Sequence, residues 1–355
     1  MPRAIAFILA LLIAAPVAAD ADFDRNELLK NLSDRVDKWK LGREDGYIYV
    51  WEIGTAMTEL AWGDQKVWYE KLRNYAVKDL IMKDPWADGF VGWRYKSGTP
   101  LDASGTAEAL RLSEGLLAGY KKYGNPDDLK NSDRVLGGYL RHQYVDKGIW
   151  MIRNYFNFDT KSFALNSYIS GYDAEFMTSA GEHNNEAKKA AEETIKLLKK
   201  VSADNGFLEE ILQPEVLTAL PGVSPAFSPN GVRSIFNSCS VLDRAAAAVP
   251  DQGRKLLDFA VKSVKMDHGR GVREPGLALY WKDDKPTTNS PQAGVATYAC
   301  LTRLSVRLKH GDAEKMFQPL MERELKRVGK TMQMFDLVET LMTARVIADR
   351  NAGKR

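Results

Sequence analysis

The sequence has little cysteine and little histidine, with two cysteines (Cys239 and Cys300) and four histidines among 355 residues. Two cysteines are too few for a small disulfide-stapled scaffold, and both lie in apolar helical patterns. The sequence leaves open a Cys239–Cys300 disulfide or two buried free thiols. The histidines are scattered, and the chain has no His-Glu-x-x-His, glycine-rich phosphate loop or Gly-x-Ser-x-Gly. We therefore expect no metal site and no cofactor.

A strong net charge is also missing. Fifty basic and 47 acidic residues give a net charge of +3, and the two signs are mixed along the chain. No basic stripe favours a nucleic acid or an anionic membrane as a partner.

Long apolar runs are absent after the first twenty residues. Residues 1–19 combine Arg3, an apolar run from Ala4 to Ala15 and the small residues Val17-Ala18-Ala19, which is the pattern of a cleavable secretory signal peptide. We expect a periplasmic or secreted product without stable membrane insertion, in which residues 20–355 form a single catalytic domain.

No segment alternates apolar and polar residues over the length of a half-buried strand. Helical patterns recur instead, and they indicate an all-α protein. The predicted helices span 24–39, 48–62, 66–82, 102–123, 131–144, 163–180, 187–202, 233–248, 252–267, 290–309, 313–329 and 335–350.

The connections between these helices alternate in length. Short turns with helix-stop and helix-start residues follow the even helices, such as Gly63-Asp64 and Gly124-Asn125. Most connections after odd helices are long: 83–101, 145–162, 203–232 and 268–289. Antiparallel packing of neighbours would bring all the long loops to one end. Because the even helices carry less charge, they should be the inner ones. Six outer/inner hairpins of this kind form an (α/α)6 toroid.

One long loop carries several aromatics and leads into a helix. Pro85 to Tyr95 is punctuated by glycines and includes Trp93, and Pro100 to Glu108 then opens the helix that ends at Gly124. Asp102 or Ser104 suits the N-cap of this helix.

Two segments carry a resemblance to known families. Trp51-Glu52-Ile53-Gly54-Thr55-Ala56-Met57 is similar to the start of the first inner helix in family-8 glycoside hydrolases, and Pro100 to Ala107 resembles a helix start in unsaturated-uronyl hydrolases. Together with the order of elements, the chain resembles the six-hairpin (α/α)6 glycosidases. Thr106-Ala107-Glu108 stands where family 8 has Asp-Ala-Asp.

Three carboxylates are candidate catalytic residues. Glu52 lies one turn into an apolar helix, where burial would raise its pKa and suit it to protonate a leaving oxygen. Asp102 or Asp173 would then activate water in an inverting mechanism. The structural alternatives are a buried Glu52–arginine pair, an N-cap role for Asp102 and a salt bridge for Asp173.

Aromatics and arginines in or near the long loops are candidate substrate ligands, because aromatic faces stack on sugars and guanidinium groups bind carboxylates. Each aromatic could instead anchor a loop. The predicted substrate-binding residues are Trp51, Trp93, Tyr95, Tyr172, Arg233 and Trp281.

The sequence thus predicts an exported glycoside hydrolase acting on a polysaccharide or oligosaccharide through paired carboxylates. A lyase acting on a uronate polymer is an alternative, with Tyr168, Tyr172, Asn166 and Arg233 as its catalytic set. A non-catalytic glycan-binding toroid is another. The sugar, its linkage and the oligomeric state stay open.

Overall fold

The computed structural model describes residues 24–146, 148–212, 232–269 and 274–353. The predicted signal peptide lies outside these ranges, as do parts of the 203–232 and 268–289 connections. None of the helices within them is both long and apolar enough to cross a membrane.

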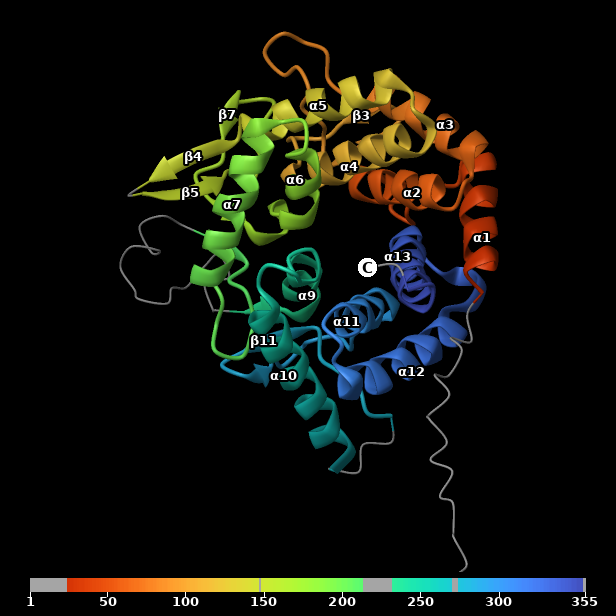
Figure 1. Ribbon diagram of the computed structural model, residues 1–355, viewed down its shortest axis with the longest axis vertical. Coiled ribbons are helices and arrows are strands. Elements are labelled where there is room, and N and C mark those ends of the chain that lie inside the picture. The colour runs from red at the N-terminus through yellow and green to blue at the C-terminus, as the bar shows by residue number, and fades with distance from the viewer. Residues whose placement is uncertain (1–23, 147, 213–231, 270–273, 354–355) are drawn as a thin grey trace, which may run out of the picture.

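Six helices form an inner ring and six more lie outside it (Figure 1). The inner helices are α2 (Val50–Trp62), α4 (Thr106–Tyr123), α6 (Ala174–Ala180), α9 (Ile235–Asp243), α11 (Val295–Arg307) and α13 (Met334–Asn351). The outer helices are α1 (Arg25–Asp37), α3 (Lys66–Tyr75), α5 (Pro126–Leu140), α7 (Asn185–Lys200), α10 (Pro250–Gly269) and α12 (Gly311–Val328). Each outer helix precedes an inner one, so the predicted all-α toroid of six hairpins is confirmed.

The inner helices contact one another around the ring. Helix α2 packs on α4, α11 packs on both α9 and α13, and α13 returns to α2. The short helix η2 (Ile169–Gly171), just before α6, contacts α4 and α9. Helices α2 and α4 approach closely because Gly54 has no side chain: a β-carbon there would clash with the backbone of Arg111.

The apolar core fills the space between the two rings. Leu32 and Val36 of α1, Leu60 of α2 and Leu72 of α3 are fully buried in one continuous cluster. Outer helices bury one face only, whereas α11 is buried from Val295 to Val306. This difference follows the charge pattern that predicted the inner and outer sets.

Short antiparallel strands tie the long connections to the starts of the inner helices. They are β1 (Ile48–Tyr49), β2 (Arg94–Lys96), β3 (Thr99–Pro100), β4 (Gln143–Asp146), β5 (Ile149–Ile152), β6 (Phe156–Asn157), β7 (Ser162–Phe163), β8 (Ser167–Tyr168), β9 (Ile211–Leu212), β10 (Arg233–Ser234), β11 (Tyr280–Lys282) and β12 (Lys285–Pro286). For example, β1 directly precedes α2 and pairs with β2, while β10 precedes α9 and pairs with β11.

The other two long connections behave in the same way: Asn157 bridges to Ala103 before α4, and β9 pairs with β8 before α6. The described parts of all four long connections therefore lie at one end of the ring. We call this the loop end. The prediction about loop placement is therefore confirmed for the described residues.

Four helix starts differ from prediction by four residues or more. The helices expected from 102 and 290 begin later, at Thr106 and Val295. The helix expected at 163–180 is regular only from Ala174, because Ser167 and Tyr168 pair with Leu212 and Ile211 as a strand. The helix expected from 131 begins earlier, at Pro126, because the Asn125 side chain accepts a hydrogen bond from the Asp127 amide at 3.1 Å and proline suits the first helical position.

Candidate active site

A cleft of about 530 Å³ opens at the loop end, over the N-terminus of α4. Its walls come from the aromatic loop before α4 and from the segments around β6 and β8. The lining residues are Trp93, Asp102, Ala103, Ser104, Gly105, Thr106, Ala107, Glu108, Asn154, Tyr155, Asn166, Tyr168 and Ser170.

Glu108 is a carboxyl group in this cleft. It lies in the first turn of α4, and its side chain folds back over Gly105, the N-cap residue, where a β-carbon would clash with its Oε2 atom. Burial raises the pKa of Glu108 to about 7, against the opposing effects of its own backbone amide and of Arg111. Glu108 can therefore hold a proton near neutral pH.

Glu52 has the same property on the neighbouring inner helix. It is fully buried in the first turn of α2, and burial raises its pKa to about 7 even though Arg43 opposes the shift. The Arg43 guanidinium lies 2.5 Å from Oε1, and Oε2 has no hydrogen-bond partner among the described residues. Arg43 is about one-third exposed and stacks on Tyr49. The prediction of a desolvated acid and the alternative of an arginine pair thus both hold.

Asp102 lines the cleft as an exposed side chain with a left-handed backbone (φ 57°). It is not the N-cap of α4, and neither is Ser104, because Gly105 occupies that position. Trp93, predicted as a sugar-stacking residue, also lines the cleft, and the Arg94 guanidinium covers its ring at 4.0 Å.

Ser104 and His142 fix the floor of the cleft. The Ser104 hydroxyl lies 2.9 Å from Nε2 of His142 and accepts a hydrogen bond from the Phe156 amide at 2.8 Å. Nδ1 of His142 faces the Gly138 carbonyl at 3.0 Å. Burial lowers the pKa of His142 to about 4, so the imidazole is neutral and accepts the Ser104 proton.

A chain of hydrogen bonds runs from the cleft wall into the protein. The Asn237 amide nitrogen donates to the Tyr168 hydroxyl at 2.9 Å and to Oε1 of Glu210 at 3.1 Å. The Ser234 amide donates to the same oxygen at 2.6 Å. Burial raises the pKa of Glu210.

Asp173 lies among ion pairs and does not line the cleft. It is fully buried, caps α6 by accepting from the Phe176 amide at 2.8 Å, and pairs with Arg111 and Arg244. Asp173 therefore forms the salt bridge that the structural alternative predicted.

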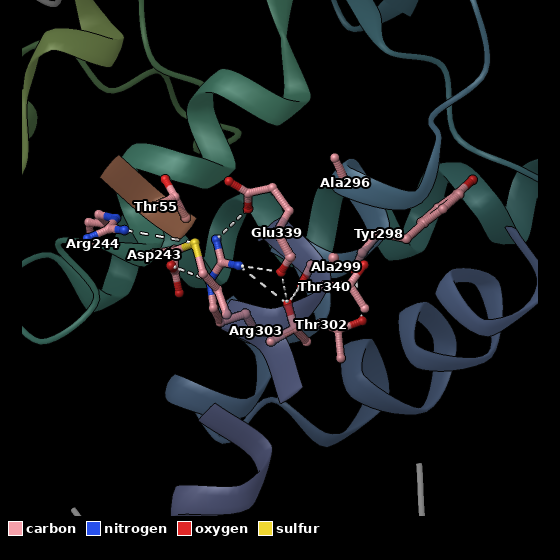
Figure 2. A network of polar contacts seen from close by, with 12 residues as sticks. Thr55, Asp243, Arg244, Ala296, Tyr298, Ala299, Thr302, Arg303, Glu339 and Thr340 are labelled. Atoms are coloured by element: carbon pink, nitrogen blue, oxygen red, sulfur yellow. Dashed lines mark hydrogen bonds and ion pairs between the residues drawn. The ribbon is translucent and has the colours of Figure 1, made fainter. Parts of the chain in front are cut away.

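These ion pairs extend across the seams between inner helices. Arg303 on α11 donates to Asp243 of α9 at 2.7 Å and to Glu339 of α13 at 3.0 Å, with all three residues almost completely buried (Figure 2). Arg345 on α13 likewise binds Glu59 of α2 at 3.0 Å. We call these buried pairs, together with Asp173, Arg111, Glu114 and Arg244, the ion-pair belt.

Three aromatics that were expected to stack on sugars are core residues, which corrects the prediction. Trp281 is 5% exposed and donates its indole N–H to the Ala278 carbonyl at 2.6 Å. Tyr95 donates to the Leu80 carbonyl at 2.7 Å, and the Tyr172 hydroxyl accepts from the Ile152 amide at 3.0 Å. The strand pairing and these backbone partners turn the rings inward.

The remaining two predicted ligands have protein partners. Arg233 binds Glu209 and is only partly exposed. Trp51 lies under the Arg111 guanidinium at 4.5 Å. Neither residue lines the cleft.

Cys239 and Cys300 are free, buried thiols on α9 and α11 in this structure, and the described residues contain no cluster of His, Cys, Asp and Glu that could hold a metal ion.

Sequence reasoning missed Glu108 and Glu210. The sequence around Glu108 does carry a signal for its position, because a glutamate three residues after a helix N-cap typically folds back toward that residue. Glu210 had none, because only the β8–β9 pairing brings it beside Asn237.

Comparison with known proteins supports the fold. No protein-family model and no curated protein matches the sequence. Among solved structures, a family 8 cold-adapted xylanase aligns with a TM-score of 0.70 and 12% identity over 91% of each chain. An α-amylase from Clostridium perfringens aligns with a TM-score of 0.69 and 12% identity, over 90% of this chain and 97% of the other. An endo-β-1,4-glucanase from Acetobacter xylinum gives 0.66 and 14%, over 92% and 100%. At these identities the likeness shows the (α/α)6 toroid fold alone.

Proposed function

We propose that this protein is a glycoside hydrolase that binds a polysaccharide or oligosaccharide in the cleft at the loop end. The observation that carries the proposal is a pair of carboxyl groups, Glu52 and Glu108, each with a pKa raised to about 7, in the first turns of adjacent inner helices. A carboxylic acid that is protonated near neutral pH is what protonation of a glycosidic oxygen requires. The solved structures that share the fold are named as glycan-cleaving enzymes, which supports the same class.

We propose Glu52 as the proton donor, with Glu108 as the alternative. In favour of Glu52 are the resemblance of its helix to family 8 and an Oε2 atom that has no partner among the described residues. Against Glu52, its side chain is fully buried, paired with Arg43, and absent from the cleft lining. Glu108 already lines the cleft.

Asp102 is the proposed base. It is the other carboxylate in the cleft lining, and it is open to solvent, where an attacking water would arrive. Asp173 has less support in this role, because Arg111 and Arg244 hold its carboxylate. We propose inversion, for which the two carboxyl groups lie roughly 6.5–9.5 Å apart with water between them. The anomeric form of the first product, read by NMR, tests this directly.

Trp93 and Tyr155 are the residues that we propose to stack on sugar rings. Together with Tyr168, they are the aromatic residues in the cleft lining. We also propose export to the periplasm or the medium, on the strength of residues 1–19.

A matched pair of variants tests the proposal. Glu52→Gln and Glu108→Gln each keep side-chain shape and remove the transferable proton. The proton donor's variant should lose on the order of 10²-fold or more in turnover on xylan or carboxymethyl-cellulose, and wild-type activity should fall on the basic side near pH 7. Glu70→Gln, at an exposed position on α3, is the control. If wild-type protein releases no reducing ends from xylan, carboxymethyl-cellulose or starch, the proposal fails.

The lyase alternative has less support. Burial and the nearby Glu210 charge raise the pKa of Tyr168, so the phenol keeps its proton and makes a poor base. Arg233, the expected partner of a uronate, is paired with Glu209. Binding of glycans without turnover by the wild-type protein would favour the non-catalytic alternative.

A further inference from the structure

Tyr168 has a defined hydrogen-bond direction in the cleft wall. Glu210 lies just before β9, Tyr168 ends β8, and Asn237 lies in the first turns of α9. Three separate segments therefore meet at this point, close to the cleft.

The direction follows from the chemistry of each group. A glutamate carboxylate accepts hydrogen bonds, and Oε1 of Glu210 takes the Ser234 amide at 2.6 Å and the Asn237 NH2 group at 3.1 Å. Asn237 is thereby oriented with its NH2 group toward Glu210, and it gives its second N–H to the Tyr168 oxygen at 2.9 Å. The Tyr168 oxygen thus accepts a hydrogen bond from Asn237, and no acceptor for the Tyr168 proton lies among the described residues.

Tyr168 lines the cleft together with Glu108 and Asn166, whereas Asn237 and Glu210 do not. We propose that Glu210 and Asn237 are positioning residues, which fix Tyr168 as a hydrogen-bond donor to an oxygen of the bound sugar. The ligand class in this inference, a sugar, rests on the proposed function. The direction of the hydrogen bonds around Tyr168 is independent of that function.

The direction can be tested without any ligand. A neutron structure of the unliganded protein should show deuterium on both Asn237 N–H positions and the Tyr168 deuterium on the cleft side of the ring. A Tyr168 deuterium directed at Asn237 would overturn the proposal whether or not the protein is a glycosidase.

A double-mutant cycle tests the consequence, with xylohexaose, cellohexaose and maltohexaose as probes and KM and kcat measured separately. Tyr168→Phe removes the donor and should raise KM by about 10-fold, the effect of one hydrogen bond to an uncharged partner. Asn237→Asp replaces the NH2 group by an acceptor that captures the Tyr168 proton, so it should give a similar rise in KM.

The combined variant distinguishes positioning from a structural role. If Asn237 acts through Tyr168, Asn237→Asp adds nothing to Tyr168→Phe, and Asn237→Asp alone keeps kcat within about 3-fold. If the KM effects multiply in the double variant, the proposal is wrong. Glu210→Gln should act in the same direction as Asn237→Asp, because its amide can present an N–H toward Asn237. A wild-type protein that neither binds nor cleaves the three probes would count against the proposed function, and the neutron result would still decide the direction.

Discussion

Two carboxyl groups on the same helix, α4, have pKa values that are shifted in opposite directions. Burial raises the pKa of Glu108 to about 7, at the cleft. Burial acts in the same direction on Glu114, yet Arg244 and Arg111 outweigh it and hold the pKa of Glu114 at about 2. The difference is direct pairing with two arginines, since Glu114 lies 2.7 Å from Arg244 and 3.1 Å from Arg111.

The same contrast separates three carboxyl groups at the loop end from two in the ion-pair belt. Glu52, Glu108 and Glu210 at the loop end have raised pKa values, whereas Asp243 and Glu114 in the belt have lowered ones. Where burial outweighs the nearby arginines, as at Glu52 and Glu108, the carboxyl group holds a proton near neutral pH; where the arginines outweigh burial, as at Glu114 and Asp243, it stays ionised. This contrast teaches that burial alone does not mark a catalytic acid.

The largest expected effect comes from breaking the belt. Arg303→Met removes the arginine paired with Glu339 and one of the two paired with Asp243, which keeps Arg307 at 3.0 Å. Because both carboxylates are almost fully buried, the variant should cost about 3–5 kcal/mol of unfolding free energy. Chemical denaturation measures this, with the exposed Arg254→Met as a control. A loss below about 1 kcal/mol would show that the belt contributes little.

Two tryptophans sharpen the comparison between core and cleft. Trp281→Ala should cost about 3–5 kcal/mol, because the ring packs edge-on against Phe259 in the core. Trp93→Ala should cost no more than about 1 kcal/mol and mainly weaken glycan binding. Thermal unfolding and binding of xylohexaose separate the two. Equal losses of stability in both variants would make Trp93 a structural anchor as well.

A smaller effect, of opposite sign, is expected at Glu108. Its raised pKa means that the folded protein retains a proton which the unfolded chain releases above about pH 4.5, so stability falls as the pH rises from 4.5 through 7. Glu108→Gln removes this loss. The variant should match the wild type at pH 4 and exceed it by up to about 3 kcal/mol at pH 8. Urea unfolding at both pH values checks this, and a variant less stable at pH 8 would contradict it.

The ring architecture could be predicted because helix periodicity and connection length are local properties of the sequence. Gly124, with φ 73°, ends α4 where the sequence indicated, and the Asn125 cap starts the next helix. Glu52 stood out for a similar reason, as a lone charge in an apolar helix.

The rest of the site depends on pairing between distant segments, which leaves no local signal. The register of the β10–β11 ladder places Trp281 opposite Arg233, and this register sets which face of β11 turns inward. Asp173 meets Arg111 and Arg244 because three inner helices converge on it. Neither outcome follows from the residues next to these side chains.

The two ends of the described chain also lie together. Helix α1 packs against α13, and Arg35 donates to the Met332 carbonyl at 2.5 Å. The last described hairpin therefore closes the ring against the first. Arg35 and Met332 are 297 positions apart in the sequence, so closing the ring carries the entropic cost of joining distant segments.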